Sequence, residues 1–285
     1  MEPSEARVEL LLRWSDGTRR DLPWRWTRDP WAILVSELML QQTQVARVMP
    51  KFVAFMDRFP TAVACASSPV ADVIESWAGL GYNRRAVNLH RTAAIVATDH
   101  GGTLPESLEG LLALPGVGPY TARAVLVFAH EFDGGVVDTN VRRILARWTN
   151  GPLSATEAQA LADASVPAGH SWAWHQALFD LGASLCSARS PRCGDCPVEP
   201  CCAWAGVGED PAIPAPKQSR FEGSDRQGRG RLVDALRSGP VRGADLAAIM
   251  GWPDDTPRAD RVAATLVVDA LAVWIEAIDT WRLPR

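Results

Sequence analysis

Four cysteines stand close together in the sequence with the spacing C-x6-C-x2-C-x5-C, at Cys186, Cys193, Cys196 and Cys202. Thiolate is a preferred ligand of zinc and of iron–sulfur clusters, so this spacing predicts a metal centre. Ligand type alone does not separate a four-cysteine zinc site from a cluster. Disulfides are less favoured, because no secretory segment precedes the chain and we expect a reducing cytoplasm. Cys65, alone in an alanine-rich stretch, is predicted to be a core residue.

Two carboxylates stand in surroundings that would give them different chemistry. Glu37 lies in WAILVSELMLQQ, which is apolar on both sides, so burial should raise its pKa and let it donate a proton near neutrality. Asp138 stands where a helix N-cap would, and the helix dipole with nearby arginines should keep it ionised. Opposite pKa shifts on paired carboxylates divide the roles in glycoside cleavage. Taken alone, each residue is better explained structurally, as a satisfied buried carboxylate and as a cap.

The segment LPGVGPYTA, residues 114–122, lies between two stretches with helical periodicity and is predicted to form a helix-hairpin-helix. Gly116 and Gly118 let the backbone turn tightly and approach another molecule, and Val117 and Thr121 stand beside them. The helix that follows offers free amide groups at its positive end, which suits a phosphate. We favour a DNA phosphate contact over a purely structural turn.

The elements that must position these residues are mostly helices. Apolar residues recur at helical spacing along the chain, while alternating strand patterns are scarce before its C-terminal end. The fold is therefore predicted to be mainly α. Helix starts are predicted at Ser4, at Asp29-Pro30, at Ser68-Pro69 and at Pro119, and helix ends at Gly79, at Gly101-Gly102 and at Gly134-Gly135.

Proline and charge density rise over residues 210–231, which we interpret as a linker. Residues 232–285 then form a small separate unit, with two or three helices and an alternating stretch, Val273 to Leu283, that predicts a β-hairpin. This combination indicates a winged-helix-like module.

Length, charge and hydropathy exclude some classes of protein. A chain of 285 residues predicts two or three domains, and no apolar run approaches the roughly 20 residues that span a bilayer, so we expect no membrane insertion. The net charge of -4 excludes a uniformly basic nucleic-acid binder but not a local basic face. Taken singly, each arginine pair is better explained as a solvated helix face: Arg19/Arg20, Arg84/Arg85 and Arg142/Arg143.

These motifs together resemble a known family. LPGVGPYTA, then VVDTNVRRILARW, then the four cysteines are similar to the helix-hairpin-helix DNA glycosylases of the endonuclease III superfamily. SELMLQQTQVARV at residues 36–48 and GLGYNRRAVNLH at residues 79–90 resemble the A/G-specific adenine glycosylases, the MutY family. The matching motifs span residues 22–202, about two thirds of the chain.

The resemblance implies a fold and a cofactor. It implies a six-helix barrel domain with the helix-hairpin-helix at 23–133, and an iron–sulfur cluster domain with the N-terminal helix at 1–22 and 134–209. A four-iron four-sulfur (4Fe-4S) cluster would be held by Cys186, Cys193, Cys196 and Cys202, leaving Cys201 as a bystander. The cluster would shape a DNA-contacting loop that carries Arg189 and Arg192.

The resemblance also implies roles for the carboxylates. Glu37 would protonate adenine at ring nitrogen 7, and Asp138, assisted by Tyr120 and Asn140, would stabilise or capture the sugar cation. In bifunctional relatives a lysine stands in place of Tyr120 and forms a Schiff base. Tyrosine cannot, so we expect base removal without efficient strand cleavage.

Extruding a base from a duplex costs a few kcal/mol and requires residues that fill the gap. By resemblance, Gln42 and Tyr82 are the wedging residues, and the adenine pocket is lined by Arg20, Arg25, Trp24 and Trp31. The chain departs from the family at Asn83, where a second tyrosine is common, and after Lys217, where a Nudix-like domain would not fit. Recognition of 8-oxoguanine is thereby left open. The C-terminal module either binds duplex through Arg226, Arg229, Arg231 and Arg242 or packs on the catalytic body.

The expected partner is double-stranded DNA containing an adenine mispair. We expect a cytoplasmic, nucleoid-associated monomer, with replication or mismatch-repair partners unidentified. Rival functions are a bifunctional pyrimidine glycosylase, which would want lysine at position 120, and a thymine-mismatch glycosylase, which would not be expected to carry Glu37 in its motif. A non-catalytic damage-binding module would need neither carboxylate.

Overall fold

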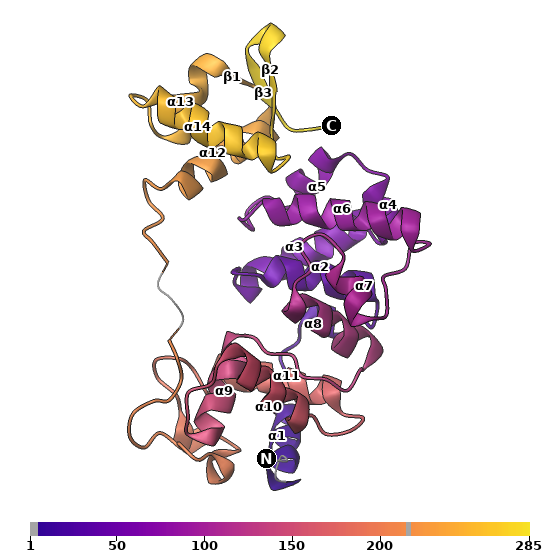
Figure 1. The fold of residues 1–285 in the computed structure, drawn as a ribbon, viewed down its shortest axis with the longest axis vertical. Coiled ribbons are helices and arrows are strands. Elements are labelled where there is room, and N and C mark those ends of the chain that lie inside the picture. The colour runs from indigo at the N-terminus through magenta and orange to yellow at the C-terminus, as the bar shows by residue number, and fades with distance from the viewer. Residues whose placement is uncertain (1–4, 215–217) are drawn as a thin grey trace. The chain divides into compact units, whose positions relative to one another are not determined.

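The computed structural model describes residues 5–214 and 218–285, and most of its elements are helices, which confirms the predicted mainly α class (Figure 1). The chain divides into two compact units. The first comprises Met1–Ile33, Glu106–Leu112 and Val117–Lys217, and the second comprises Leu34–Pro105, Ala113–Gly116 and Gln218–Arg285. Ser4, a predicted helix start, and residues 215–217 of the predicted linker lie outside the described residues.

The first unit is helical, and its described residues include an apolar core. Its buried side chains come mainly from the helices that contain Leu11, Trp148 and Trp174, and the two indole rings lie 6.0 Å apart. The elements are α1 (Glu5–Thr18), η1 (Pro23–Arg25), α7 (Leu108–Leu112), α8 (Pro119–His130), α9 (Thr139–Thr149), α10 (Ala155–Ser165), α11 (Ser171–Ser184), η2 (Cys193–Asp195) and η3 (Glu199–Cys201). Pro119 occupies the first turn of α8 as predicted.

The second unit contains a helical part and the C-terminal module. The helical elements are α2 (Pro30–Leu40), which begins in the first unit, α3 (Val45–Arg58), α4 (Ala62–Ala66), α5 (Val70–Ser76) and α6 (Arg84–Asp99). Helix α2 begins at Pro30, and α5 begins at Val70 directly after Ser68-Pro69, both as predicted. Cys65 is fully buried on α4, which confirms it as a core residue.

The C-terminal module contains the predicted hairpin. Its elements are α12 (Asp225–Ser238), β1 (Val241–Arg242), η4 (Gly243–Asp245), α13 (Leu246–Met250), α14 (Thr256–Val268), β2 (Val273–Ile275), η5 (Glu276–Ile278) and β3 (Thr280–Arg282). The strands form an antiparallel sheet in the order β1-β3-β2, with Trp274 opposite Trp281. The predicted linker 210–231 was too long, because α12 begins at Asp225, where the Ser224 hydroxyl caps the Gln227 amide.

No helix among the described residues is long and apolar enough to cross a membrane.

Candidate functional site

Asp138 is the N-cap of α9, as its sequence predicted. One carboxylate oxygen accepts from the Val141 amide at 2.7 Å, and the other accepts from the Asn140 side-chain amide at 2.9 Å. The direction of the Asp138 pKa shift is opposite to the one expected from the helix dipole and the nearby arginines. Burial raises the pKa of Asp138, and this desolvation outweighs the hydrogen bonds from Val141 and Asn140 and the charge of Arg143, which lower it.

A buried histidine that sequence reasoning missed holds the segment before Asp138. The Val136 amide donates to His175 Nε2 at 2.9 Å, so the imidazole proton lies on Nδ1, which is 2.7 Å from the Ser171 carbonyl oxygen. His175 is fully buried, and burial lowers its pKa to about 4. The imidazole is therefore neutral around pH 7 and fixes the backbone two residues before the carboxylate. Nothing in the apolar sequence of α11 signals this partner.

Glu37 lies in the second unit on α2, and it is 5% exposed among apolar neighbours on the same helix. This confirms the buried position that its sequence predicted.

The helix-hairpin-helix turn is tight at Gly116, whose φ is +78°. A Cβ on Gly116 would lie 2.8 Å from the Asn88 Cβ, so only glycine fits the backbone here. Gly118 is the N-cap of α8, and half-buried Tyr120 lies in the first turn of that helix. The side chains of Val117 and Thr121 are buried, so phosphate contacts at these two positions would come from backbone amides.

The two predicted wedging residues lie in turns of the same unusual conformation. Gln42 has φ +54° and Tyr82 has φ +46°, both exposed residues in the left-handed region. Such conformations are strained for residues other than glycine and cluster at functional sites. We call residues 41–43 and 80–82 the left-handed turns.

Arg85 connects the left-handed turns. It is 8% exposed, so for this residue the interpretation as a solvated helix face was wrong. One nitrogen donates to the carbonyls of Leu38, Met39 and Gln41 at 2.5–3.0 Å. The other terminal nitrogen donates to the carbonyls of Leu80 and Gly81 at 3.1 and 2.9 Å. One guanidinium therefore satisfies the C-terminal carbonyls of α2 and fixes both turns.

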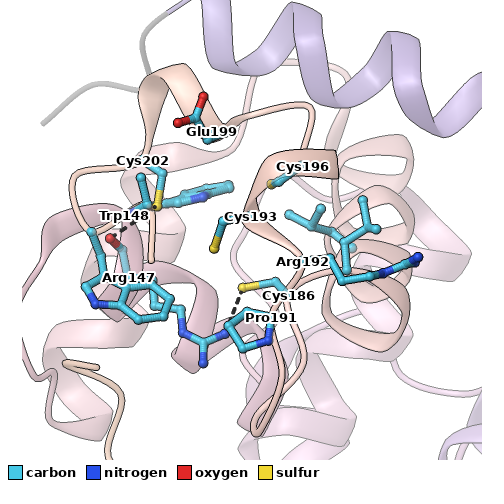
Figure 2. Close-up of a pocket in the computed structure, with 13 residues that line it drawn as sticks. Arg147, Trp148, Cys186, Pro191, Arg192, Cys193, Cys196, Glu199 and Cys202 are labelled. Carbon is cyan, nitrogen blue, oxygen red and sulfur yellow. Dashed lines mark hydrogen bonds between the residues drawn. The ribbon is translucent and has the colours of Figure 1, made fainter. Parts of the chain in front are cut away.

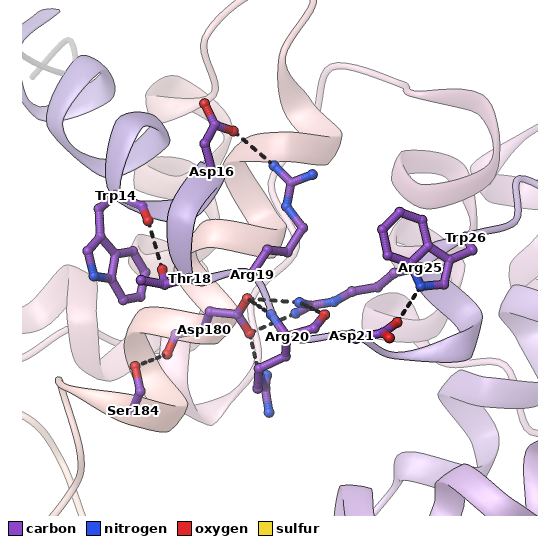
Figure 3. Close-up of polar contacts among 10 residues, drawn as sticks. All are labelled: Trp14, Asp16, Thr18, Arg19, Arg20, Asp21, Arg25, Trp26, Asp180 and Ser184. Atoms are coloured by element: carbon purple, nitrogen blue, oxygen red, sulfur yellow. Dashed lines mark hydrogen bonds and ion pairs between the residues drawn. The ribbon is translucent and has the colours of Figure 1, made fainter.

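Arg20 and Arg25, predicted to line the adenine pocket, both contact Asp180 of α11 (Figure 3). Arg25 is bidentate, with N–O distances of 2.8 and 2.9 Å, and both it and Asp180 are buried. Burial alone would raise the pKa of Asp180, but the two guanidinium groups hold it below its ordinary value. These contacts give the arginines a structural role, attaching the segment after α1 to α11. Trp24 and Trp31 are buried.

The four cysteines line one cavity (Figure 2), together with Arg147, Trp148 and Trp204. Arg147 donates to the Cys186 sulfur at 3.1 Å, and the Ala205 amide donates to the Cys202 sulfur at 3.4 Å. None of the six cysteines forms a disulfide. Cys201 does not line the cavity, and its carbonyl accepts from Arg7 instead.

Two arginines of α9 hold the cysteine loop in place. Arg143 donates to the carbonyls of Cys186 and Gly182 at 2.7–3.0 Å. Arg147 is 1% exposed, pairs with Asp210 at 2.6 Å and lies over the Trp204 ring at 4.7 Å. Asp210 follows the last cysteine, so this ion pair fastens the outgoing chain beside the cavity.

This chain is similar to several known DNA repair proteins. Residues 35–167 match the HhH-GPD superfamily of base excision DNA repair proteins. The adenine DNA glycosylase of Mycolicibacterium smegmatis is 44% identical over 268 residues, 92% of this chain and 90% of that protein. That of Mycobacterium tuberculosis is 44% identical over 277 residues, 92% of this chain and 88% of its own. The structure of a thermostable thymine-DNA glycosylase matches with a TM-score of 0.67 and 31% identity, over 70% of this chain and 94% of its own.

Proposed function

Because this chain belongs to the adenine DNA glycosylase family of the HhH-GPD superfamily, we propose that it removes adenine mispaired with 8-oxoguanine or guanine in duplex DNA. The observation that carries the proposal is the extent of the similarity. The 8% of this chain left uncovered by the M. smegmatis protein is about 23 residues, fewer than the 68 residues of 218–285. The likeness therefore continues into the C-terminal module. The thymine-DNA glycosylase covers 70% of this chain and leaves about 85 residues unmatched, more than the module contains.

The proposed chemistry is hydrolysis of the N-glycosyl bond with Glu37 as the acid. A purine anion is a poor leaving group, so a proton on ring nitrogen 7 from Glu37 would let the bond break. Departure of the base leaves positive charge on the sugar, and Asp138 would stabilise or capture it. The amide of Asn140 holds one Asp138 oxygen and the Val141 amide holds the other, which supports a fixed orientation for this carboxylate.

Four thiols line one cavity, and no histidine or aspartate is among the described residues that line it. Four thiolates are the usual ligands of a four-iron four-sulfur cluster, and they also suit zinc. The similarity of the cysteine spacing to that of the endonuclease III superfamily favours the cluster. We propose that Cys186, Cys193, Cys196 and Cys202 hold the cluster. When bound, it would fix the loop that carries Arg189 and Arg192.

The test is single-turnover cleavage of a duplex with one adenine opposite 8-oxoguanine, with and without alkali. Replacing Glu37 by Gln should lower the rate of adenine release by about 10²–10⁴-fold, the range for loss of a general acid. Glu106→Gln is the control, because Glu106 is exposed. Strand cuts should depend on alkali, because Tyr120 cannot form a Schiff base.

A second candidate substrate is thymine opposite guanine. The structural similarity to the thymine-DNA glycosylase suggests it. The same assay with thymine in place of adenine separates the two. Release of thymine but not adenine by wild-type protein would overturn the proposal, and full activity of Glu37→Gln would remove Glu37 from the mechanism.

A further inference from the structure

The C-terminal module contacts the parts of its own unit that carry the left-handed turns. Arg237 of α12 donates to the Ile74 carbonyl at 3.1 and 2.9 Å and to the Asn83 side-chain oxygen at 2.9 Å. Its side chain is only 10% exposed. Asn83 directly follows Tyr82 and is the N-cap residue of α6, but its side chain caps no helix amide. The Asn83 side chain is bonded to the module instead.

Two further contacts reach the same region. The Gln218 side-chain amide donates to the Gln42 side-chain oxygen at 2.8 Å, and the Gln218 oxygen accepts from Arg226 at 3.3 Å. The Asp269 carboxylate pairs with Arg84 at 3.3 Å and with Arg229 of the module at 2.5 Å. The module therefore touches Gln42 itself and both residues that follow Tyr82.

The charges of the module favour packing over duplex binding. Six of its described arginines pair with carboxylates: Arg220, Arg229, Arg237, Arg242, Arg258 and Arg261. Arg226 and Arg231 donate to uncharged oxygens instead, at Ser219 and Met250. An arginine already paired with a carboxylate has less to gain from a phosphate. Of the two roles left open by the sequence, these contacts support packing on the catalytic body.

We propose that residues 218–285 are an intramolecular brace, and that Arg237 positions the left-handed turn 80–82 for insertion into the duplex. Arg85 fixes both turns from within the helical part, and Arg237 fixes the end of α5 and the start of α6 from outside. If Tyr82 is already ordered, it loses less conformational entropy when it fills the gap left by an extruded base. The brace exists in the free protein, without DNA. Only its role in base extrusion rests on the proposed function.

The first test is hydrogen exchange of the free, full-length protein over residues 74–90. In Arg237→Ala these amides should exchange about tenfold faster, because a lost charge-assisted hydrogen bond is worth on the order of 1.4 kcal/mol. Asn83→Ala removes a single contact and should show the same effect more weakly. Arg242→Ala is the control, since Arg242 is an exposed arginine of the module paired only with nearby Asp245. Unchanged exchange in both Arg237→Ala and Asn83→Ala would overturn the brace.

The second test separates positioning from general damage. With saturating enzyme, Arg237→Ala should release adenine opposite 8-oxoguanine about tenfold more slowly. The deficit should shrink to less than about twofold when adenine faces an abasic-site analogue, because an unpaired base costs less to extrude. Equal deficits on both duplexes would refute a role in extrusion. If wild-type protein releases no adenine, the proposed function fails, while the exchange experiment still decides the brace.

Discussion

The neutral, buried His175 predicts a specific dependence of stability on pH. In the folded protein its Nε2 accepts from the Val136 amide, so a proton on this nitrogen would face an N–H group. Its folded pKa is about 4, whereas a histidine in the unfolded chain has a pKa of about 6.5. As pH falls from 6.5, the unfolded chain takes up a proton that the folded protein refuses. The contribution of neutral His175 to the free energy of unfolding is therefore fully present above pH 6.5 and is lost progressively as the pH falls to 4.

The size of the effect follows from the same two pKa values. Each unit of difference is worth about 1.4 kcal/mol, so the full loss is about 3 kcal/mol, most of it complete by pH 4.5. His175→Gln removes the titrating group while its side-chain oxygen can still accept from Val136. We expect the variant to be less stable than wild type at pH 7.5 by about 1–2 kcal/mol, since the bond to Ser171 is lost. At pH 4.5 the free energy of unfolding of the variant should equal or exceed that of wild type.

The assay is urea unfolding of both proteins at pH 7.5 and pH 4.5, compared as differences. Asp138 and the other carboxyl groups titrate in both proteins, so their contributions cancel in the comparison. The difference in unfolding free energy should change by about 2–3 kcal/mol between the two pH values. A change below about 1 kcal/mol would refute the neutral-histidine argument, because a pKa near 4 could not then belong to His175.

Two further substitutions test the supports of the site. In Gly182→Ala the new Cβ would lie 2.8 Å from the Asn140 Cβ. We therefore expect slower adenine release and a free energy of unfolding lower by about 1–3 kcal/mol. Unaltered single-turnover rates would show that Asn140 can shift without cost. Asp210→Asn removes the anionic partner of buried Arg147, so the protein should unfold at lower urea concentration. If the proposed cluster is bound, its absorbance should be lost sooner in the presence of a chelator. Wild-type behaviour in both measurements would show that the chain beside the cysteine cavity does not depend on this pair.

Features that depend on neighbours in sequence could be predicted from the sequence. The cap at Asp138 needs only the amide three residues ahead, and Pro119 needs only its own ring to favour the first turn of a helix. The β-hairpin near the C-terminus likewise came from local alternation. The four cysteines were found through their spacing, since ligands of one centre are often close in sequence.

Features that depend on distant partners could not be predicted. Arg25 meets Asp180 across 155 residues, and His175 meets Val136 across 39, and neither pairing leaves a mark in the local pattern. The direction of the Asp138 pKa shift was missed for the same reason. The cap contacts and Arg143 are close in sequence and lower the pKa, but burial, which is set by tertiary packing, outweighs them. The sequence identifies Asp138 as a capping carboxylate, but it does not reveal how far the folded protein shields that carboxylate from water.

Several arginines of this protein satisfy carbonyl groups near helix ends that lead into the left-handed turns and the cysteine loop. Arg85 does so at the end of α2 before Gln42, Arg237 near the end of α5 before Tyr82, and Arg143 near the end of α11 before the cysteine loop. The last carbonyls of a helix lack intrahelical partners, and a planar guanidinium can serve several at once. Of the 29 lysine and arginine residues, only Lys51 and Lys217 are lysines. A lysine at position 85 or 237 would keep the charge, but its three donors lie on one nitrogen and lack the two-sided fork of the guanidinium. At position 85 that fork reaches two backbone segments, and at position 237 it reaches the Ile74 carbonyl and the Asn83 side-chain oxygen. The turns should therefore loosen on substitution even though the net charge is unchanged.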